Sequence, residues 1–254
     1  MQYGLIGEKL GHSYSKQIHE QLTDYIYEPH PLSKNEFDVF MKEKDFKAIN
    51  VTIPYKQDVI PYLYEIDENA KKIGAVNTIV NRDGKLYGYN TDYLGFDYMA
   101  ANNNVSFEGK KIIVLGNGGA AQAIKAVINS HNPKEVIIVR RNQDEESITY
   151  DECYSNHTDA DIIVNTSPVG MYPNIDNAPI DIARFKNCFA VLDIIANPLE
   201  TLLVKNAKKL GMKGVGGLEM LVAQAKYAAE IFLDTTFPDE KIPEIVDNIA
   251  KEMK

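Results

Sequence analysis

The stretch "KKIIVLGNGGAAQAIKAVINS", residues 110–130, decides how the second half of this chain folds. An apolar run leads into Gly116-x-Gly118-x-x-Ala121, and apolar residues at helical spacing follow. A strand, a glycine turn and a helix in this order are typical of a dinucleotide-binding βαβ unit, in which a pyrophosphate lies at the helix N-terminus. A tight turn that binds nothing is the alternative.

The next apolar run, "EVIIVRR" at residues 135–141, ends in two arginines. Dinucleotide-binding domains that use NAD place an acidic residue here to hold the ribose 2′-hydroxyl. Arg140 and Arg141 are cations at that place, and arginine binds a phosphate through two parallel hydrogen bonds. This predicts NADP as the cofactor. A solvated charged loop is the alternative, since the acidic run 144–146 would oppose a phosphate.

Strands and helices alternate along the rest of the chain, which predicts an α/β fold. The expected elements are a strand at 2–7, a helix at 12–25, an extended piece at 25–32, a helix at 33–44 with a Ser33/Glu36 capping box, a strand at 46–56, helix with a break near Pro61 over 57–74, a hairpin around 82–84, strands at 160–170 and 189–198, and helices at 201–211 and 217–233. The polar segment 99–111 reads as a linker.

Composition limits the class of protein. The 254 residues suffice for one large domain or two ordinary ones. A net charge of −9 argues against nucleic acid as a partner. Cys153 and Cys188 form no metal-binding motif, so we expect a reducing compartment and no metal site. No apolar stretch approaches membrane-spanning length and the N-terminus lacks the pattern of a signal peptide, which favours a cytoplasmic protein without a membrane partner.

Polar side chains stand at three strand or hairpin ends of the first half. They are Asn50, Thr52 and Lys56, then Asn77 and Thr78, and then Asn90, Thr91 and Asp92. Each group alone is typical of turns. Because the strand ends of an open α/β sheet meet in one crevice, we expect these groups to converge.

Two hydroxyls flank a tyrosine in "HSYSK", residues 12–16. A helix N-cap needs one serine hydroxyl. Ser13 and Ser15 together could instead hold an anion at a helix N-terminus, and a cap remains the alternative for one of them.

The sequence resembles the shikimate dehydrogenase family over nearly its whole length. The resemblance is carried by eight motifs in order: "HSYSK", "NVTIPYK", "GAVNT", "GYNTD", "GNGGAA", "NTSPVGMYP", "NPLETLL" and "GLEMLVAQA". It implies two α/β domains flanking a cleft, the second a Rossmann-type dinucleotide-binding domain. The first domain would comprise residues 1–103 and about 216–254, and the NADP-binding domain residues 104–215.

The resemblance also implies an NADP-dependent oxidoreductase that reduces 3-dehydroshikimate to shikimate in aromatic amino-acid biosynthesis. Lys56 and Asp92 would be the catalytic pair. Substrate would be bound by Ser13, Ser15, Thr52, Asn77, Asp92 and Gln224. Cofactor would be bound by Gly116, Asn117, Gly118, Gly119 and Ala120 at the pyrophosphate, by Arg140 and Arg141 at the 2′-phosphate, and by Thr166, Ser167, Ile194 and Gly217 at the nicotinamide. The partner would be a small molecule; a homodimer stays open.

The chain departs from the family pattern in three places. Ala196 stands where the family often has tyrosine, the segment 142–159 is short, and Tyr93 follows Asp92 in place of a small residue. A quinate or dual quinate/shikimate dehydrogenase using NAD(P) is therefore an alternative. A catalytically silent NADP-binding relative is another, and a methylenetetrahydrofolate dehydrogenase-like enzyme, which would not need the two serines, is a third.

Overall fold

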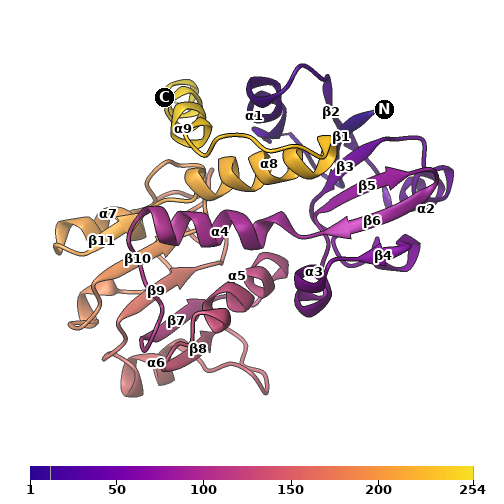
Figure 1. Ribbon diagram of the computed structural model, residues 1–254. Helices are drawn as coiled ribbons and strands as arrows, with labels where there is room; N and C mark the ends of the chain where they lie inside the picture. The colour runs from indigo at the N-terminus through magenta and orange to yellow at the C-terminus, as the bar shows by residue number, and fades with distance from the viewer. Residues whose placement is uncertain (12, 254) are drawn as a thin grey trace. The chain divides into compact units, whose positions relative to one another are not determined.

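The structure is a computed structural model and describes residues 1–11 and 13–253 (Figure 1). It divides into two compact units. Unit 1 comprises Met1–Gly95 and Val222–Glu252, and unit 2 comprises Phe96–Leu221 with Met253. Two helices, α4 (Thr91–Asn102) and α8 (Leu218–Leu233), each continue from one unit into the other.

Unit 1 is built on a six-stranded mixed sheet with the order β2-β1-β3-β5-β6-β4. Its strands are β1 (Tyr3–Gly7), β2 (Tyr27–Pro31), β3 (Ala48–Val51), β4 (Glu65–Ile66), β5 (Thr78–Arg82) and β6 (Lys85–Tyr89). Strand β1 is parallel to both β2 and β3, whereas β5 is antiparallel to β3 and to β6. The predicted hairpin is confirmed, and Gly84 turns it with a φ of 80°.

The helices of unit 1 are α1 (Ser15–Leu22), α2 (Lys34–Glu43), the 3₁₀ turn η1 (Ile60–Tyr62), α3 (Glu68–Ile73) and α9 (Lys241–Glu252). The predicted capping box of α2 is confirmed, since the Ser33 amide donates to Glu36 Oε2 at 2.8 Å. Phe37 and Met41 lie on the buried side of this helix, and the Phe37 ring stacks on Tyr55 at 4.3 Å. Helix α2 is thereby anchored to the turn that follows β3.

Three expected elements differ in the structure. The helix expected over 57–74 is interrupted by β4, because the Tyr64 amide donates to Leu86 O and draws this segment into the sheet. The helix expected at 12–25 is confirmed only over α1, and His12 lies outside the described residues. The linker expected from residue 99 begins later, because buried Phe96, Met99 and Ala100 extend α4 to Asn102.

Unit 2 is built on a five-stranded parallel sheet with the order β11-β10-β9-β7-β8. Its strands are β7 (Lys111–Leu115), β8 (Glu135–Val139), β9 (Ile162–Asn165), β10 (Ala190–Asp193) and β11 (Lys213–Val215), joined by α5 (Gly119–Ser130), α6 (Tyr150–Asn156), the 3₁₀ turn η2 (Ile182–Arg184) and α7 (Leu202–Lys209). The predicted fold class, two α/β units of which the second is Rossmann-like, is confirmed. The expected cleft stays a prediction.

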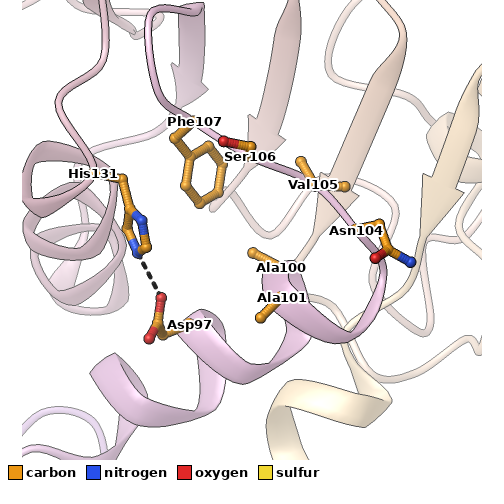
Figure 2. A pocket seen from close by; sticks show the side chains of 8 residues that line it. All are labelled: Asp97, Ala100, Ala101, Asn104, Val105, Ser106, Phe107 and His131. Carbon is orange, nitrogen blue, oxygen red and sulfur yellow. Dashed lines mark hydrogen bonds and ion pairs between the residues drawn. The ribbon is translucent and has the colours of Figure 1, made fainter.

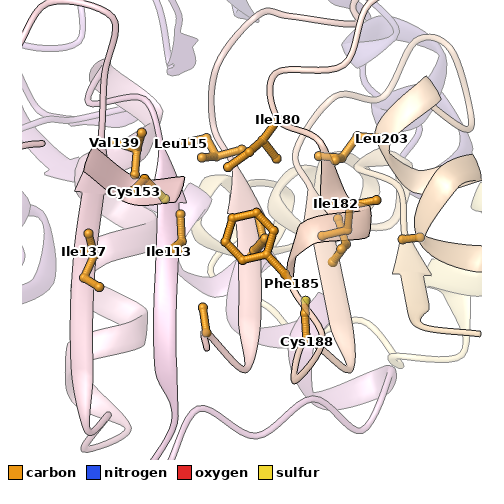
Figure 3. Packing of buried hydrophobic residues seen from close by; sticks show 14 residues of the cluster. Ile113, Leu115, Ile137, Val139, Cys153, Ile180, Ile182, Phe185, Cys188 and Leu203 are labelled. Carbon is orange, nitrogen blue, oxygen red and sulfur yellow. The ribbon is translucent and has the colours of Figure 1, made fainter. Parts of the chain in front are cut away.

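Strands buried on both faces explain the long apolar runs of the second half. Figure 3 shows one of these faces, where Ile113 of β7 and Ile137 of β8 point into a cluster around Phe185. Cys153 and Cys188 belong to this cluster as free thiols, and burial raises the pKa of each to about 11. Both cysteines therefore act as small apolar side chains of the core.

The length and apolar character of a helix decide whether it can cross a membrane. In the part of the chain that the structure describes, no helix combines the length and the apolar character that crossing a bilayer needs.

Candidate functional site

The polar groups of unit 1 share one edge of its sheet. Strands β1, β3 and β6 run in the same direction, so their carboxyl ends lie together, and the antiparallel β5 begins there. Ser13 follows β1, Thr52 and Lys56 follow β3, Asn77 precedes β5, and Asp92 follows β6. The expectation that these chain segments meet at one sheet edge is confirmed.

Lys56 and Asp92 form an ion pair at this edge. Lys56 Nζ donates to Asp92 Oδ2 at 2.5 Å, and the two side chains are only 15% and 12% exposed. Asp92 lies in the first turn of α4, where its amide donates to Asn90 Oδ1 at 3.1 Å. Limited contact with water strengthens the attraction between the charges. The pair can therefore present an oriented ammonium group and a carboxylate to the same ligand.

Asn77 is the centre of a buried hydrogen-bond network. Its Oδ1 accepts from the Thr91 amide at 2.7 Å and from the Thr78 hydroxyl at 2.9 Å. The Thr91 hydroxyl contacts the same oxygen at 3.2 Å and reaches Gln224 Oε1 at 3.5 Å. Asn77, Gln224 and the segment carrying Asp92 are thereby held together by unit 1 itself.

Sequence reasoning named Asn50 among the converging polar groups but missed Tyr27 and His19, which lie beneath this network. Asn50 Nδ2 donates to Asn77 O at 3.2 Å and to Thr78 Oγ1 at 3.1 Å, while its Oδ1 accepts from the Tyr27 hydroxyl at 2.7 Å. His19 is 1% exposed and packs on the Tyr27 ring. A polar side chain in an otherwise apolar strand, as Asn50 is in "AINV", was the available signal.

Neither predicted serine is the N-cap residue of α1, which is Tyr14. The Ser13 hydroxyl accepts from the Ser15 amide at 3.2 Å and donates to Ser15 Oγ at 3.0 Å. Ser13 thus supports the first turn of α1 from outside it. The interpretation of a serine as the N-cap is wrong, and the role of the two hydroxyls in binding an anion stays a prediction.

Thr52 is placed by a glycine. A Cβ added to Gly7 would lie 2.5 Å from Thr52 Cγ2, so only glycine lets the end of β1 come this close to the residue after β3.

In unit 2 the glycine turn lies where the strand order reverses. The chain continues from β7 to β8 on one side and then returns to β9 on the other side of β7. Gly116 follows β7 with a φ of 103°, and a Cβ there would lie 3.0 Å from Thr166 Oγ1. Ligands of open α/β sheets bind at such a reversal point.

The turn fits a pyrophosphate. Gly118 is the N-cap of α5 and supplies no side-chain cap, so the first amides of the helix are open to an anion. A Cβ added to Gly118 or Gly119 would meet nothing within 4 Å, which leaves the space that a closely approaching phosphate needs. Asn117 faces α5 instead, and its Oδ1 accepts from Lys125 Nζ at 2.9 Å. Ala120 lies within the first turn of the helix.

The residues predicted for the nicotinamide side follow β9, β10 and β11. The Thr166 hydroxyl donates to Leu115 O at 2.8 Å, and the Ser167 hydroxyl donates to Asn165 Oδ1 at 2.7 Å. A Cβ on Gly217 would lie 2.2 Å from Ile194 O, so glycine is required there for the backbones to pass. The structure thus places all four beside the same edge of the sheet.

Asp193, which sequence reasoning missed, fixes this edge. It is fully buried, and its carboxylate accepts from the Ile195 amide, the Asn165 amide nitrogen and the Thr201 hydroxyl at 2.8 to 3.1 Å. Thr201 is in turn the N-cap of α7. Burial raises the pKa of Asp193 to about 6, although the hydrogen bonds from these three donors act to lower it. A charged residue closing the apolar run "AVLD" was the signal in the sequence.

Arg140 and Arg141 follow β8 on the surface. Arg140 is ion-paired with Asp144, which also accepts from the Ser147 hydroxyl. Glu146 approaches Lys125 Nζ at 3.8 Å. Asp144 therefore occupies one of the two arginines that a 2′-phosphate would use, so a phosphate would have to displace Asp144 from Arg140.

Two hollows lie away from these side chains. One of about 390 Å³ in unit 2 is lined by Phe107 and by His131, whose Nε2 lies 2.7 Å from Asp97 Oδ1 (Figure 2). The other, of about 360 Å³ in unit 1, is lined by Tyr3 and Phe232. Neither contains a predicted site residue. Within residues 1–11 and 13–253 no group of three or more His, Cys, Asp or Glu side chains could hold a metal ion.

Known proteins are similar to this chain along most of its length. The family model of the shikimate dehydrogenase substrate binding domain matches residues 5–79. The shikimate dehydrogenase (NADP(+)) of Clostridium beijerinckii is 43% identical over 247 residues, which cover 91% of each chain. The chain belongs to the shikimate dehydrogenase family.

Solved structures of the family share the fold. A chorismate mutase/shikimate 5-dehydrogenase fusion protein from Clostridium acetobutylicum superposes with a TM-score of 0.92 at 39% identity, over 99% of this chain and 97% of that one. A shikimate dehydrogenase in complex with NADP⁺ gives a TM-score of 0.86 at 32% identity, over 98% and 95%. Membership of the shikimate dehydrogenase family thus extends over both units.

The burial of Asp193 predicts that the free energy of unfolding depends on pH in the acidic range. Because the pKa of Asp193 is about 6 when folded, against 3.8 for the free side chain, its stabilising contribution is complete below pH 3.8 and is lost as the pH rises to 6. We expect the wild type to lose about 3 kcal/mol of unfolding free energy to this group between pH 4 and 7. Asp193→Asn removes that dependence.

The measurement is urea unfolding of both proteins at several pH values. Asp176→Asn, at an exposed loop position, is the control and should follow the wild type. Parallel profiles for wild type and Asp193→Asn would contradict the assignment.

Proposed function

We propose that this chain catalyses the reversible NADPH-dependent reduction of 3-dehydroshikimate to shikimate, in the pathway to chorismate and the aromatic amino acids. The observation that carries the proposal is the Lys56–Asp92 ion pair at 2.5 Å, in a chain that is 43% identical to an NADP(+) shikimate dehydrogenase. A protein that only binds metabolites has no need of such a pair.

Lys56 and Asp92 would act on the reacting oxygen. Reduction of a ketone builds negative charge on its oxygen, and an ammonium group beside it stabilises that charge and can supply a proton. Asp92 orients the ammonium group through the hydrogen bond described above. In the reverse direction the same pair receives the proton of the substrate hydroxyl.

The remaining polar groups of unit 1 would bind and orient the substrate. Ser13 and Ser15 offer hydroxyls to its carboxylate, beside the N-terminus of α1, whose dipole favours an anion. Thr52, Asn77 and Gln224 offer hydrogen bonds to its ring hydroxyls, and Asp92 shares in that task. The burial of Asn77 supports this role, since a buried donor discriminates strongly against ligands that leave it unpaired.

NADP would be held by unit 2. Its pyrophosphate would lie at the open turn from Gly116 to Ala120, its 2′-phosphate would bind Arg140 and Arg141, and its nicotinamide would lie beside Thr166, Ser167, Ile194 and Gly217. The cofactor supplies the hydride, while the chain binds and orients it. We accordingly propose that residues 1–103 and about 216–254 form the substrate domain and 104–215 the NADP domain.

A quinate or dual-specificity dehydrogenase is the second candidate. Ala196, where the family often has a tyrosine, supports it, because a missing phenol leaves room for a different ring substituent. We further propose a cytoplasmic enzyme whose partners are small molecules. The homodimer stays a prediction, which light scattering after size-exclusion chromatography tests.

The decisive assay follows absorbance at the NADPH band. Purified protein is incubated with shikimate or quinate and with NADP⁺ or NAD⁺, and the four rates are compared. We expect the shikimate and NADP⁺ pair to have the highest kcat/KM. Turnover of quinate without turnover of shikimate would overturn the proposal, and so would the absence of turnover with every pair.

Removing the lysine should abolish catalysis without unfolding the protein. Lys56→Ala is expected to lower kcat by roughly 100- to 10,000-fold, the usual range for losing a positioned proton donor. Circular dichroism and the affinity for NADP⁺, measured by fluorescence titration, serve as controls and should stay unchanged. An unchanged kcat would show that Lys56 is not catalytic.

Because Arg140 and Asp144 form an ion pair after β8, substitutions of these two residues should change the KM for NADP⁺ in opposite directions. Arg140→Ala removes a phosphate ligand and should raise the KM for NADP⁺ by about tenfold or more, whereas Asp144→Asn frees Arg140 and should lower it by about threefold. The KM for NAD⁺, which lacks the 2′-phosphate, is the control. Equal effects on both cofactors would contradict this assignment.

A further inference from the structure

Lys125 lies on α5 beside the glycine turn, and the function proposed above gives it no role. Its Nζ donates to Asn117 Oδ1 at 2.9 Å, and its side chain is only 16% exposed. Gln122 Nε2 donates to the same oxygen at 3.2 Å. Because a neutral donor already serves Asn117, this hydrogen bond leaves the positive charge of Lys125 unexplained.

The ammonium group of Lys125 has donors to spare. It carries three N–H bonds, and within residues 1–11 and 13–253 Asn117 is its one hydrogen-bond acceptor. The one carboxylate oxygen within 4 Å in those ranges is Glu146 Oε2, which at 3.8 Å is too far for a hydrogen bond. The Glu146 side chain is 74% exposed, and an ion pair of this kind contributes little. The ammonium group can therefore exchange Glu146 for another anion with little loss.

Lys125 and Arg140 both pair with the same acidic loop. Asp144 is ion-paired with Arg140, and Glu146 approaches Lys125. A compact turn holds the two carboxylates near each other, since the Glu146 amide and the Ser147 hydroxyl both donate to Asp144 Oδ1, at 3.2 Å and 2.5 Å. Two cations thus face two carboxylates. A phosphate monoester carries nearly two negative charges, so it matches the charge of both carboxylates.

The position of Lys125 relates it to the ribose of a dinucleotide. In a dinucleotide-binding unit the pyrophosphate lies at the glycine turn, and the ribose 2′ position lies at the end of the second strand. Asn117 belongs to that turn, and Glu146 belongs to the loop that follows β8. Lys125 reaches both segments, so its ammonium group lies between them.

We propose that Lys125 is a specificity-determining residue for NADP: its ammonium group binds the 2′-phosphate together with Arg140, and Glu146 pairs with Lys125 until the phosphate replaces it. The proposal rests on the proposed function for the use of a nicotinamide cofactor, and it adds a phosphate ligand on α5 to those after β8. Such a cation offsets the engagement of Arg140 by Asp144, because no carboxylate holds Lys125 at hydrogen-bond distance.

Binding of two cofactors to variants of Lys125 tests the proposal. NADP⁺ and NAD⁺ differ by the 2′-phosphate alone, and isothermal titration calorimetry without substrate gives the Kd of each. Lys125→Met keeps the aliphatic stem and removes the charge, whereas Lys125→Arg keeps a cation. We expect Lys125→Met to raise the Kd for NADP⁺ about tenfold with less than about twofold change for NAD⁺, and Lys125→Arg to stay within about threefold of the wild type.

Gln122→Met is the matched control, because it removes the other donor to Asn117 without changing the charge. We expect its Kd values for both cofactors to stay within about twofold of the wild type. Equal weakening of NADP⁺ and NAD⁺ in Lys125→Met would reduce Lys125 to a support of the turn and overturn the proposal. Unchanged Kd values in Lys125→Met would overturn it too, as would the same selective loss in Gln122→Met.

A measurement on the wild type covers the case in which Lys125→Met does not fold. Acetic anhydride acetylates accessible lysines, and peptide mass spectrometry reads the extent at each. At saturating cofactor we expect NADP⁺ to protect Lys125 about threefold more than NAD⁺ does, with exposed Lys134 acetylated equally in both. Equal protection of Lys125 would overturn the proposal. A protein that binds NADP⁺ in this way but does not turn over shikimate would refute the proposed function and leave the assignment of Lys125 standing.

Discussion

The direction in which the strands of each sheet run is the constraint on which both proposed sites depend. Parallel neighbours end on the same edge of a sheet, so residues that follow different strands are brought together without any contact along the chain. In unit 1, β3 and β6 both pair antiparallel with β5 and therefore run in the same direction. Lys56 after β3 and Asp92 after β6 thus lie at the edge where β5 begins, with Asn77 just before it. In unit 2 parallel pairing gathers the glycine turn, Thr166 and Ile194.

Buried polar groups keep each edge in one arrangement. Asn50 and Asp193 both lie in or at the end of a central strand and each satisfies hydrogen bonds from several elements. A buried polar group without partners is costly, so a strand slipped out of register would leave these groups unpaired and be penalised. Burial disfavours the ionised form of both Asp193 and His19, so it raises the pKa of the carboxyl group and lowers the pKa of the imidazole.

Local patterns predicted much of the fold. The capping box at Ser33, the hairpin at Gly84 and the glycine turn after β7 depend on residues within a few positions of each other, and all three are present. The short strand β4 was missed, because it exists only through its pairing with β6. Helix α4 was missed and its last residues were interpreted as a linker, because burial of Met99 and Ala100 outweighs the low helix propensity of the asparagines that follow.

The sequence by itself determined which residue types end each strand, and with them the family and the candidates Lys56, Asp92 and Gly116. Each motif reflects the chemistry of a few neighbouring residues, and eight motifs in the same order are specific to one family. Only the tertiary structure decided which of these groups touch: the ion pair of Lys56 with Asp92 and the buried hydrogen bonds that join Asn50, Asn77 and Thr91. Such contacts join residues that are distant along the chain or depend on burial, and no local pattern encodes either.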